Sequence, residues 1–365
     1  MDNLKNAVGI VEHITGKNIT IPILSSILLE AEKGKVTLSS TNLELGMKTW
    51  FRGSVREGGR VAVSARTLGV FVSNLRPSDL VILESKGQDL IIESKSQRTV
   101  LKGYNGEDFP LFPEFKQERF LSILKQTLLD VLRKTVVSAS LSTIKPEIAS
   151  ILFSVKNTML LVASTDSFRL SEEKVDKKYF TTKTNTFSFL LPRRTAEELL
   201  RILQNDAKGE VVISLDANNL TATGENFVLF SRLTEGSFPD YSAIVPHKFE
   251  TSVVINKKDL IEHIKASSIF SGKLSELILT VEPHKKNVTF SAKSADIGEH
   301  ISYMDAAITG KELSLTLNWK YFLDGIASFA EDDLFLGFNN ESSPVLVKSQ
   351  KSDDSLYLIM PMRST

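Results

Sequence analysis

Hydrophobic and polar residues alternate along much of the chain in short runs, a pattern typical of strands with one buried and one exposed face. VTLSSTNLEL (36–45) and TMLLVAS (158–164) are two such runs. Between them lie stretches in which apolar residues recur every three or four positions, which predicts helices. The chain is therefore predicted to adopt an α+β fold with helices packed on β-sheets.

One strand pattern occurs three times. The copies are SSILLEAEKGKVTLSSTNLELGM (25–47), ASILFSVKNTMLLVASTDSFRLS (149–171) and SELILTVEPHKKNVTFSAKSADIGEHISYM (275–304). Each contains an apolar strand, a polar turn, a second alternating strand, a corner rich in Ser and Thr, and a third strand. Such self-similarity indicates repeated structural units.

A helical pattern precedes each copy and a second one follows it. The preceding helices are indicated by Leu4, Val8 and Val11, by Leu128, Val131 and Leu132, and by Leu260, Ile261 and Ile264. The following helices are indicated by Leu68, Phe71, Val72 and Leu75, by Ala196, Leu199, Leu200 and Leu203, and by Phe322, Leu323, Ile326 and Phe329. We interpret the chain as three α+β domains, each with two helices and roughly eight strands, at 1–116, 117–248 and 249–365.

A strand is predicted before the first helix of the second and third domains, at 118–123 and 250–255. The first domain is predicted to lack this strand, because the helical pattern begins almost at residue 1. The Gly-rich run REGGR (56–60) predicts a hairpin turn.

The end of each unit also repeats. RTVLKGYNGEDFP (98–110) and NFVLFSRLTEGSFP (226–239) run from a strand into Phe-Pro, and SLYLIMP (355–361) is their third counterpart. The apolar residues near the end of the chain are therefore predicted to form a domain-closing strand. Alternate side chains of that strand can face the domain core and an outer groove.

Composition narrows the possible chemistry. The chain has no cysteine, which excludes disulfides and thiolate catalysis and fits a reducing compartment. Its longest apolar runs are far too short to span a membrane, and its first residues do not resemble a signal peptide. Lys and Arg number 44, as do Asp and Glu, so the net charge is zero. A dedicated nucleic-acid binder is often basic overall, but a sum does not show how charge is distributed.

No catalytic or metal-binding motif is evident, and no cofactor is predicted. The five histidines (His13, His247, His263, His284 and His300) show no metal-ligand spacing. Gly16-Lys17 lacks the spacing of a phosphate-binding loop. Asp166 lies at a predicted strand corner, where an Asp most often forms a turn. An enzyme whose site has no recognisable motif stays an alternative.

Positive charge recurs on four predicted helices: Arg66 and Arg76 on 64–76, Lys125, Arg133 and Lys134 on 125–138, Arg193, Arg194 and Arg201 on 193–205, and Lys257, Lys258 and Lys265 on 257–270. Exposed helix faces are commonly charged, and Glu197, Glu198, Asp259 and Glu262 support that simpler interpretation. If the repeat brings these helices to one surface, that surface is basic.

The chain resembles the bacterial DNA polymerase III β subunit family, the replicative sliding clamps. The resemblance covers nearly the whole chain and rests on TIPILSSILL (20–29), STDSFRLS (164–171), LLPRR (190–194), EGSFPDY (235–241) and YLIMPMR (357–363). It implies three repeated DNA-clamp domains and a ring-shaped head-to-tail homodimer that encircles duplex DNA without sequence preference. It also implies a cytoplasmic protein with no enzyme activity and no membrane association.

The resemblance further implies partners that bind through short linear peptides, namely the replicative polymerase catalytic subunit, the clamp loader and repair polymerases. Their groove is expected to be lined by Ile148, Thr165, Ser167, Phe168, Arg169, Leu170, Pro239, Ile244, Leu358, Met360, Pro361 and Met362. Methionine suits a site that accepts many partners, because its flexible side chain repacks easily.

Two further sets of residues follow from the resemblance. The residues expected to face DNA are Arg66, Lys125, Arg133, Lys134, Arg193, Arg194, Lys257 and Lys258. Those expected at the dimer interface are Arg98, Thr99 and Leu101 on an edge strand of the first domain, and Ile269 and Phe270 at a helix end of the third.

The chain also departs from the family pattern. Ser167-Phe168 stands where the family usually has Gly followed by His or Tyr, and Lys145 and Ala243 replace common arginines. Ser364-Thr365 ends the chain where one apolar residue is typical. A clamp-fold paralogue that acts as a protein-interaction scaffold or a resistance variant is therefore an alternative function.

Overall fold

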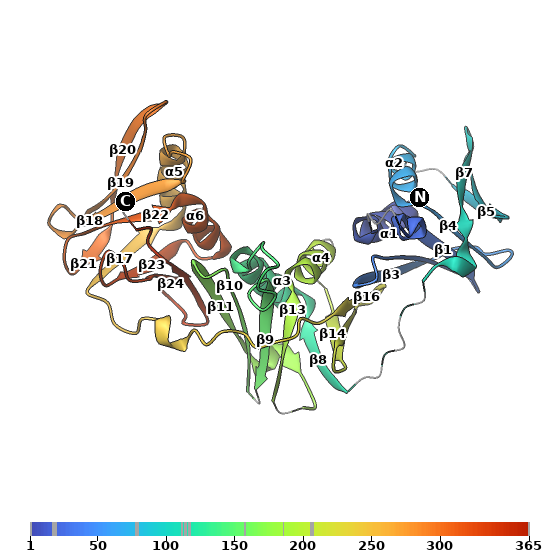
Figure 1. The fold of residues 1–365 in the computed structure, drawn as a ribbon, viewed down its shortest axis with the longest axis horizontal. Coiled ribbons are helices and arrows are strands. Elements are labelled where there is room, and N and C mark those ends of the chain that lie inside the picture. Colours follow the sequence, from blue (N-terminus) through green and yellow to red (C-terminus); the bar gives the residue numbers. More distant parts are fainter. Residues whose placement is uncertain are drawn as a thin grey trace. The chain divides into compact units, whose positions relative to one another are not determined.

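The structure, a computed structural model, describes residues 2–16, 20–76, 80–110, 112, 115, 118–156, 158–184, 186–204 and 208–363. Its α-helices are α1 (Asp2–Val11), α2 (Ala65–Ser73), α3 (Lys125–Thr135), α4 (Arg193–Leu203), α5 (Lys257–Ser268) and α6 (Trp319–Ser328). They lie where the apolar periodicity predicted helices (Figure 1).

Polar residues before three of the helices explain where those helices begin. The Asn256 side chain accepts hydrogen bonds from the backbone N–H groups of Lys258 and Asp259 at the start of α5. Asn318 does the same for α6, and Ser64 accepts one such bond at the start of α2. A side-chain acceptor at this position satisfies N–H groups that have no partner within the helix.

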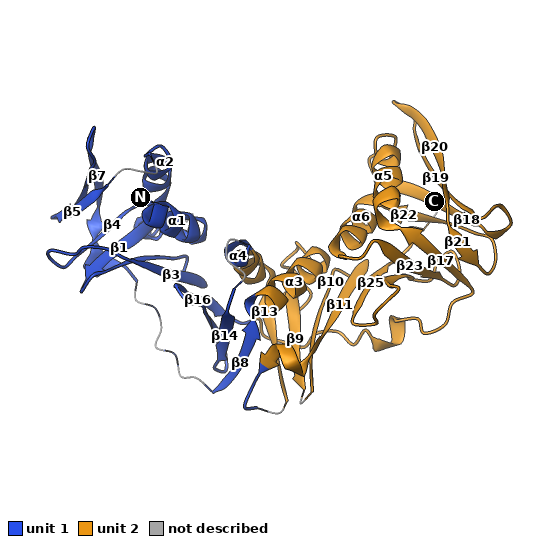
Figure 2. Cartoon of the chain, turned by 180° about the vertical axis from the view of Figure 1, so that it is seen from behind, with its two compact units in different colours: residues 1–125, 181–184, 201–233 blue, residues 126–180, 185–200, 234–365 orange. Residues whose placement is uncertain are grey.

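The chain packs into two compact units: residues 1–125, 181–184 and 201–233, and residues 126–180, 185–200 and 234–365 (Figure 2). The boundaries of the three proposed domains therefore stay an interpretation of the sequence repeat.

The first unit contains a twelve-stranded sheet in the order β12-β8-β14-β15-β16-β3-β2-β1-β4-β7-β6-β5. Its strands are β1 (Ser26–Glu32), β2 (Lys35–Thr41), β3 (Leu45–Arg52), β4 (Gly59–Ser64), β5 (Ile82–Lys86), β6 (Asp89–Glu93), β7 (Arg98–Asn105), β8 (Arg119–Leu124), β12 (Phe180–Thr181), β14 (Glu210–Leu215), β15 (Asn219–Thr223) and β16 (Phe227–Arg232).

The second unit contains a nine-stranded sheet, β13-β9-β10-β11-β25-β24-β23-β17-β21, and a four-stranded sheet, β20-β19-β18-β22. Their strands are β9 (Ser150–Lys156), β10 (Met159–Thr165), β11 (Arg169–Asp176), β13 (Phe187–Pro192), β17 (Thr251–Asn256), β18 (Glu276–Glu282), β19 (Asn287–Ser294), β20 (Gly298–Asp305), β21 (Ala307–Thr309), β22 (Leu313–Asn318), β23 (Asp333–Phe338), β24 (Val345–Ser349) and β25 (Ser355–Ile359).

Two strand pairings join distant parts of the chain in the same way. In the first unit β3 pairs with β16, and this pairing together with the corner at residues 41–45 is here named the first joint. In the second unit β11 pairs with β25, and this pairing together with the corner at residues 165–169 is the second joint. Each joint is thus formed by the third strand of one repeat and a domain-closing strand.

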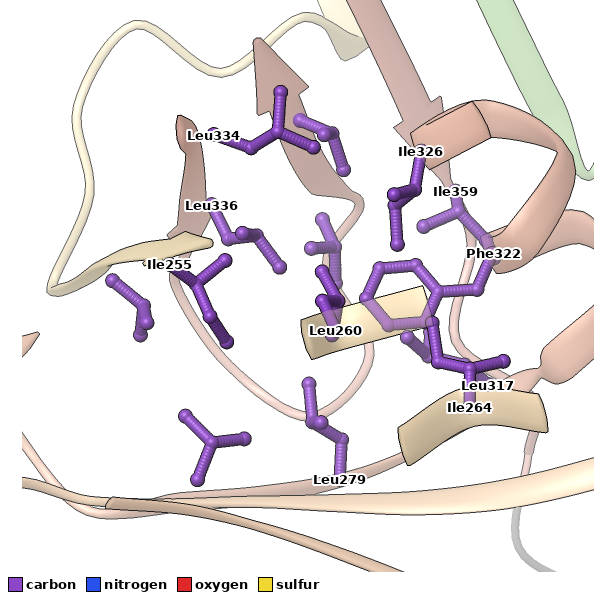
Figure 3. Close-up of a cluster of buried hydrophobic side chains, with 14 of the residues drawn as sticks. Ile255, Leu260, Ile264, Leu279, Leu317, Phe322, Ile326, Leu334, Leu336 and Ile359 are labelled. Carbon is purple, nitrogen blue, oxygen red and sulfur yellow. The ribbon is translucent and has the colours of Figure 1, made fainter. Parts of the chain in front are cut away.

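The predicted closing strand at 355–361 is confirmed as β25. Figure 3 shows Ile359 in the apolar core that also contains Phe322 and Leu260, and Tyr357 belongs to the same cluster. Leu358, between them, belongs instead to a second cluster with Leu170. The alternating pattern of this strand therefore serves two apolar regions, as predicted.

Two predictions about local structure have different outcomes. In the second and third proposed domains a strand precedes the first helix, since β8 precedes α3 and β17 precedes α5. In the first domain residues 2–4 are already helical, in agreement with the prediction that this domain lacks such a strand. The predicted hairpin turn at 56–60 is wrong, because β3 pairs with β2 while β4 pairs with β1. In the sheet β2 and β1 lie between β3 and β4, so the segment that contains residues 56–60 is a crossover connection. A Gly-rich composition does not reveal this.

Candidate functional site

The corner at residues 165–169 has a defined hydrogen-bonded geometry. The Thr165 hydroxyl donates to the Arg169 carbonyl at 2.7 Å, and the Asp166 carboxylate accepts from the backbone N–H of Phe168 at 2.9 Å. Ser167 adopts the left-handed backbone conformation, with φ of 77°, which a glycine adopts at lower cost. This tight turn leaves Phe168 60% exposed at the edge of the second joint.

The side chain of Arg169 ties this corner to α6 through two ion pairs. Its buried guanidinium binds the carboxylates of Asp166 at 3.0 Å and Asp324 at 2.7 Å, and lies 4.2 Å from the ring centre of Tyr321. Burial alone would lower the pKa of Arg169, but Tyr357 and the two carboxylates outweigh it and raise the pKa. Arg169 therefore acts as a permanently charged support, not as an exposed groove residue.

Leu170 and Leu358 form the centre of the second joint. They are directly paired across β11 and β25, both are buried, and both contact a small apolar cluster that includes Leu346. Tyr241 and Val245, from the segment after Phe238-Pro239, pack against this cluster. The joint thus has a buried apolar centre that this segment helps to cover.

The end of the chain crosses the same region. The backbone N–H of Met360 donates to the Phe168 carbonyl at 2.8 Å, and that of Met362 donates to the Thr316 carbonyl of β22 at 2.8 Å. Met360, Pro361 and Met362 are half-buried. The tail is therefore held by both the corner and an edge strand.

A hollow of about 760 Å³ adjoins the cluster. Pro239, Tyr241 and Leu356 line it, together with Lys156, Lys174 and Lys348. The Tyr241 hydroxyl donates to the Glu172 carboxylate at 2.5 Å. Burial and this bond raise the pKa of Tyr241, so the hydroxyl keeps its proton.

The structure thus brings together most of the expected groove residues but not all. Ile148 is half-buried and Ile244 is exposed on a short 3₁₀ turn, and neither belongs to the apolar cluster. The sequence analysis did not identify Tyr241, Val245 and Leu346 as members of this apolar cluster. The position of Leu346 between Val345 and Val347 could have identified it, because neighbouring residues on a strand face opposite sides.

A buried polar triangle supports the second joint. The Lys134 ammonium binds the Glu173 carboxylate at 3.0 Å and the Ser355 hydroxyl at 2.7 Å, and Ser355 donates to Glu173 at 2.7 Å. Burial raises the pKa of Glu173 to about 7, although Lys134 and Ser355 act to lower it. The ammonium of Lys134 is therefore bound inside the protein, which disfavours the predicted contact with DNA.

Other expected DNA contacts differ in their exposure. Four have exposed side chains on helices, namely Arg66, Arg133, Arg194 and Lys258. They stay candidates for phosphate contacts.

Three more of the expected DNA contacts have cations that are buried or bound within the chain. Lys125, at the junction of β8 and α3, is only 2% exposed. The Lys257 ammonium donates to the Phe329 carbonyl at 2.9 Å. Arg193 is mostly buried, where it binds Glu197 at 2.8 Å. A cation that is bound to groups of its own chain is less available to phosphates.

The expected interface residues on β7 lie on a partly unpaired strand. Arg98 to Lys102 pair with β6, whereas β4 pairs only with residues 103–105. One edge of the strand at 98–102 therefore has no partner among the described residues. Arg98 is exposed, whereas Leu101 is buried within the single chain. Val100 is exposed in its place.

The other expected interface residues lie beside a second edge strand. Ile269 follows α5 and is 62% exposed, and the Phe270 ring stacks on His300 of β20 at 5.5 Å. Within the described chain, β20 pairs only with β19 and carries the exposed side chains of Ile301 and Tyr303. Exposed apolar side chains on an edge strand are typical of a surface that pairs with another chain.

Two other kinds of site are absent from the described residues. No group of three or more His, Asp or Glu side chains there could hold a metal ion. No described helix is long and apolar enough to cross a membrane.

Comparison with protein families gives three matches in order along the chain. Residues 1–113 match the N-terminal domain of the DNA polymerase III beta subunit, residues 122–240 match its central domain, and residues 242–363 match its C-terminal domain.

Individual relatives cover the whole chain at low identity. The beta sliding clamp of Bacillus subtilis is 24% identical over 100% of this chain and 98% of that protein, and that of Rickettsia bellii is 28% identical over 99% and 97%. A Pseudomonas aeruginosa sliding clamp solved with griselimycin is 25% identical with a TM-score of 0.92, covering 100% of this chain and 98% of that one. The crystal structure of the Bacillus subtilis clamp has a TM-score of 0.90 at 23% identity, with the same coverage.

Proposed function

The chain belongs to the DNA polymerase III β subunit family, the sliding clamps, and from this premise we propose that two copies close into a ring around duplex DNA. The observation that carries the proposal is the ordered match of all three family domains over residues 1–363. The chain is a DNA sliding clamp that tethers the replicative polymerase and other DNA enzymes without catalysing a reaction itself. It acts in the cytoplasm, where bacterial DNA is replicated.

Closure explains how a protein with zero net charge can stay on DNA. A ring that encircles the duplex is linked to it topologically, so it needs only weak and sequence-independent attraction to phosphates. Exposed basic side chains such as Arg66, Arg133, Arg194 and Lys258 are suited to that role. The unpaired edges of β7 and β20 support a head-to-tail interface, in which two different surfaces meet and the rotation completes a circle.

The second joint is the proposed binding site for partner peptides. The buried Leu170 and Leu358 form its apolar floor and the half-buried Met360 adds an adaptable side chain, while backbone groups at the corner fix its shape. A polymerase that binds there gains a high effective concentration at the primer end, which produces processivity without additional DNA contacts.

Topological linkage is tested by comparing circular and linear DNA. The chain is loaded by its cognate clamp loader onto nicked circular DNA and isolated in high salt, and the DNA is then cut once. Retention on the circle followed by release after the cut supports encirclement. Equal loss from both forms contradicts it. Retention without stimulation of polymerase processivity would instead favour the scaffold paralogue.

A further inference from the structure

The first joint repeats the architecture of the second, position by position. At the corner of the first joint, the Thr41 hydroxyl donates to the Leu45 carbonyl at 3.0 Å and Leu43 has φ of 77°, as Ser167 has at the second. The Arg232 N–H donates to the Glu44 carbonyl at 3.0 Å, just as Met360 donates to Phe168. Both corners therefore create the same backbone frame beside a closing strand.

The centres of the two joints differ in one decisive pair. Gly46 pairs with Phe230 in the first joint, where Leu170 pairs with Leu358 in the second. Because glycine has no side chain, the first joint has a gap on this face of the sheet. The ring of Phe112 fills that gap: a Cβ atom added to Gly46 would collide with it.

Phe112 is held in the gap by specific contacts. Its ring stacks on Phe230 with centroids 4.7 Å apart, and the Lys48 ammonium lies 4.5 Å from its centre. Stacked aromatic pairs and cation–π contacts both stabilise a ring beyond the burial of its surface. Burial lowers the pKa of Lys48, in keeping with a partly desolvated ammonium.

Resting on the proposed function of the second joint, we propose that Phe112 is the internal occupant of a second, equivalent groove. It restricts partner peptides to the joint between β11 and β25. Phe112 lies on the segment after the Phe109-Pro110 pair, as Tyr241 lies after Phe238-Pro239. Tyr241, however, packs against the cluster of Leu170 and Leu358 with its hydroxyl bound to Glu172, whereas Phe112 fills the place of a missing side chain and stacks on Phe230.

The proposal is tested with a synthetic peptide of residues 107–115, EDFPLFPEF, which carries the occupant itself. Isothermal titration of the full chain counts the peptides bound per chain, and a photoreactive benzophenone at the position of Phe112 locates them. The Phe112→Ala variant is expected to bind one more peptide per chain than the wild type. The added site should cross-link next to Phe230.

A matched peptide separates this proposal from the proposed function. The same peptide with Ala in place of the Phe112 residue should fail to fill the added site of Phe112→Ala. An unchanged count in Phe112→Ala overturns the proposal, as does an added site that the Ala-substituted peptide still fills. Absence of binding at the second joint counts only against the proposed peptide groove.

Thermal melting checks that each variant folds. If Phe112→Ala does not give a single native transition, Phe112→Leu keeps an apolar side chain while removing the ring, and the same additional site is expected. A folded Phe112→Leu chain with the wild-type count overturns the proposal.

Discussion

Leu170 and Leu358 lie directly opposite each other on β11 and β25, although the two strands come from different repeats of the chain. Their contact joins these repeats and forms the centre of the proposed groove. Leu358 and its neighbour Ile359 face different apolar clusters, which allows binding and folding to be probed separately.

The Leu358→Ala and Ile359→Ala variants are expected to differ in this way. Ile359→Ala removes a fully buried side chain from the core shown in Figure 3, so the free energy of unfolding should fall by about 2–5 kcal/mol. Leu358→Ala also removes a buried side chain, but it should in addition weaken peptide binding at least tenfold, which Ile359→Ala should not do. Urea unfolding and peptide titration measure the two effects, and an unchanged peptide affinity in Leu358→Ala counts against the groove.

Deletion of residues 360–365 should abolish partner-peptide binding while leaving the ring intact. The deletion begins immediately after Ile359, so the core cluster keeps its residues, whereas the hydrogen bonds from Met360 to Phe168 and from Met362 to Thr316 are removed. Titration with a partner-derived peptide tests binding, and light scattering tests assembly. Wild-type affinity in the truncated chain would refute the prediction.

Glu173 should make stability depend on pH. Its pKa rises from 4.5 to about 7 in the folded chain, so between these values the folded state binds a proton that the unfolded state lacks. The contribution of Glu173 to the free energy of unfolding therefore falls as pH rises from about 4.5 to 7, by up to about 3 kcal/mol.

Substitution at the triangle checks this prediction. Glu173→Gln should flatten the dependence measured by urea unfolding between about pH 5 and pH 8. Ser355→Ala removes a hydrogen bond from the carboxylate and should steepen it, because that bond acts to lower the pKa. An identical pH profile in wild type and Glu173→Gln would show that the carboxyl group does not titrate in this range.

Local patterns predicted most of the fold because each helix and strand buries one face whose period is visible in the sequence. The two faces of β25 followed from the alternation of Tyr357, Leu358 and Ile359. The hairpin predicted at 56–60 failed because glycine signals a turn without showing which strands it joins. Strand order depends on contacts between distant segments, which short-range periodicity does not encode.

The candidate site shows the same limit. Motif resemblance located Leu170 and Leu358, but it could not separate exposed cations from buried ones. Lys134 binds Glu173 and Ser355, which lie 39 and 221 positions away, and no local feature of the sequence announces these partners. The sequence shows which residues are charged, but only the packing shows which of those charges are exposed to a ligand such as DNA.

Substitution of the exposed cations Arg66, Arg133, Arg194 and Lys258 by Ala should weaken attraction to DNA. Each phosphate interaction that a substitution removes should reduce the slope of log affinity against log salt by about 0.9. The slope is measured from binding to a short linear duplex over a range of salt. Lys134→Met serves as the control, because its buried ammonium should affect stability and leave the salt slope unchanged. A slope unaltered by all four substitutions would exclude these side chains from DNA contact.

Ile269→Ala combined with Phe270→Ala should convert the proposed ring into soluble monomers. Ile269 is mostly exposed and Phe270 stacks on His300 at the surface, so their removal should cost the single chain little stability. The same side chains would be fully buried between two copies, and their loss should raise the dimer dissociation constant by tenfold or more. Multi-angle light scattering gives the mass, and thermal melting gives the stability. A dimer with a sharply lowered melting temperature would show instead that the pair belongs to the core of its own chain, and the head-to-tail interface would then have to lie elsewhere.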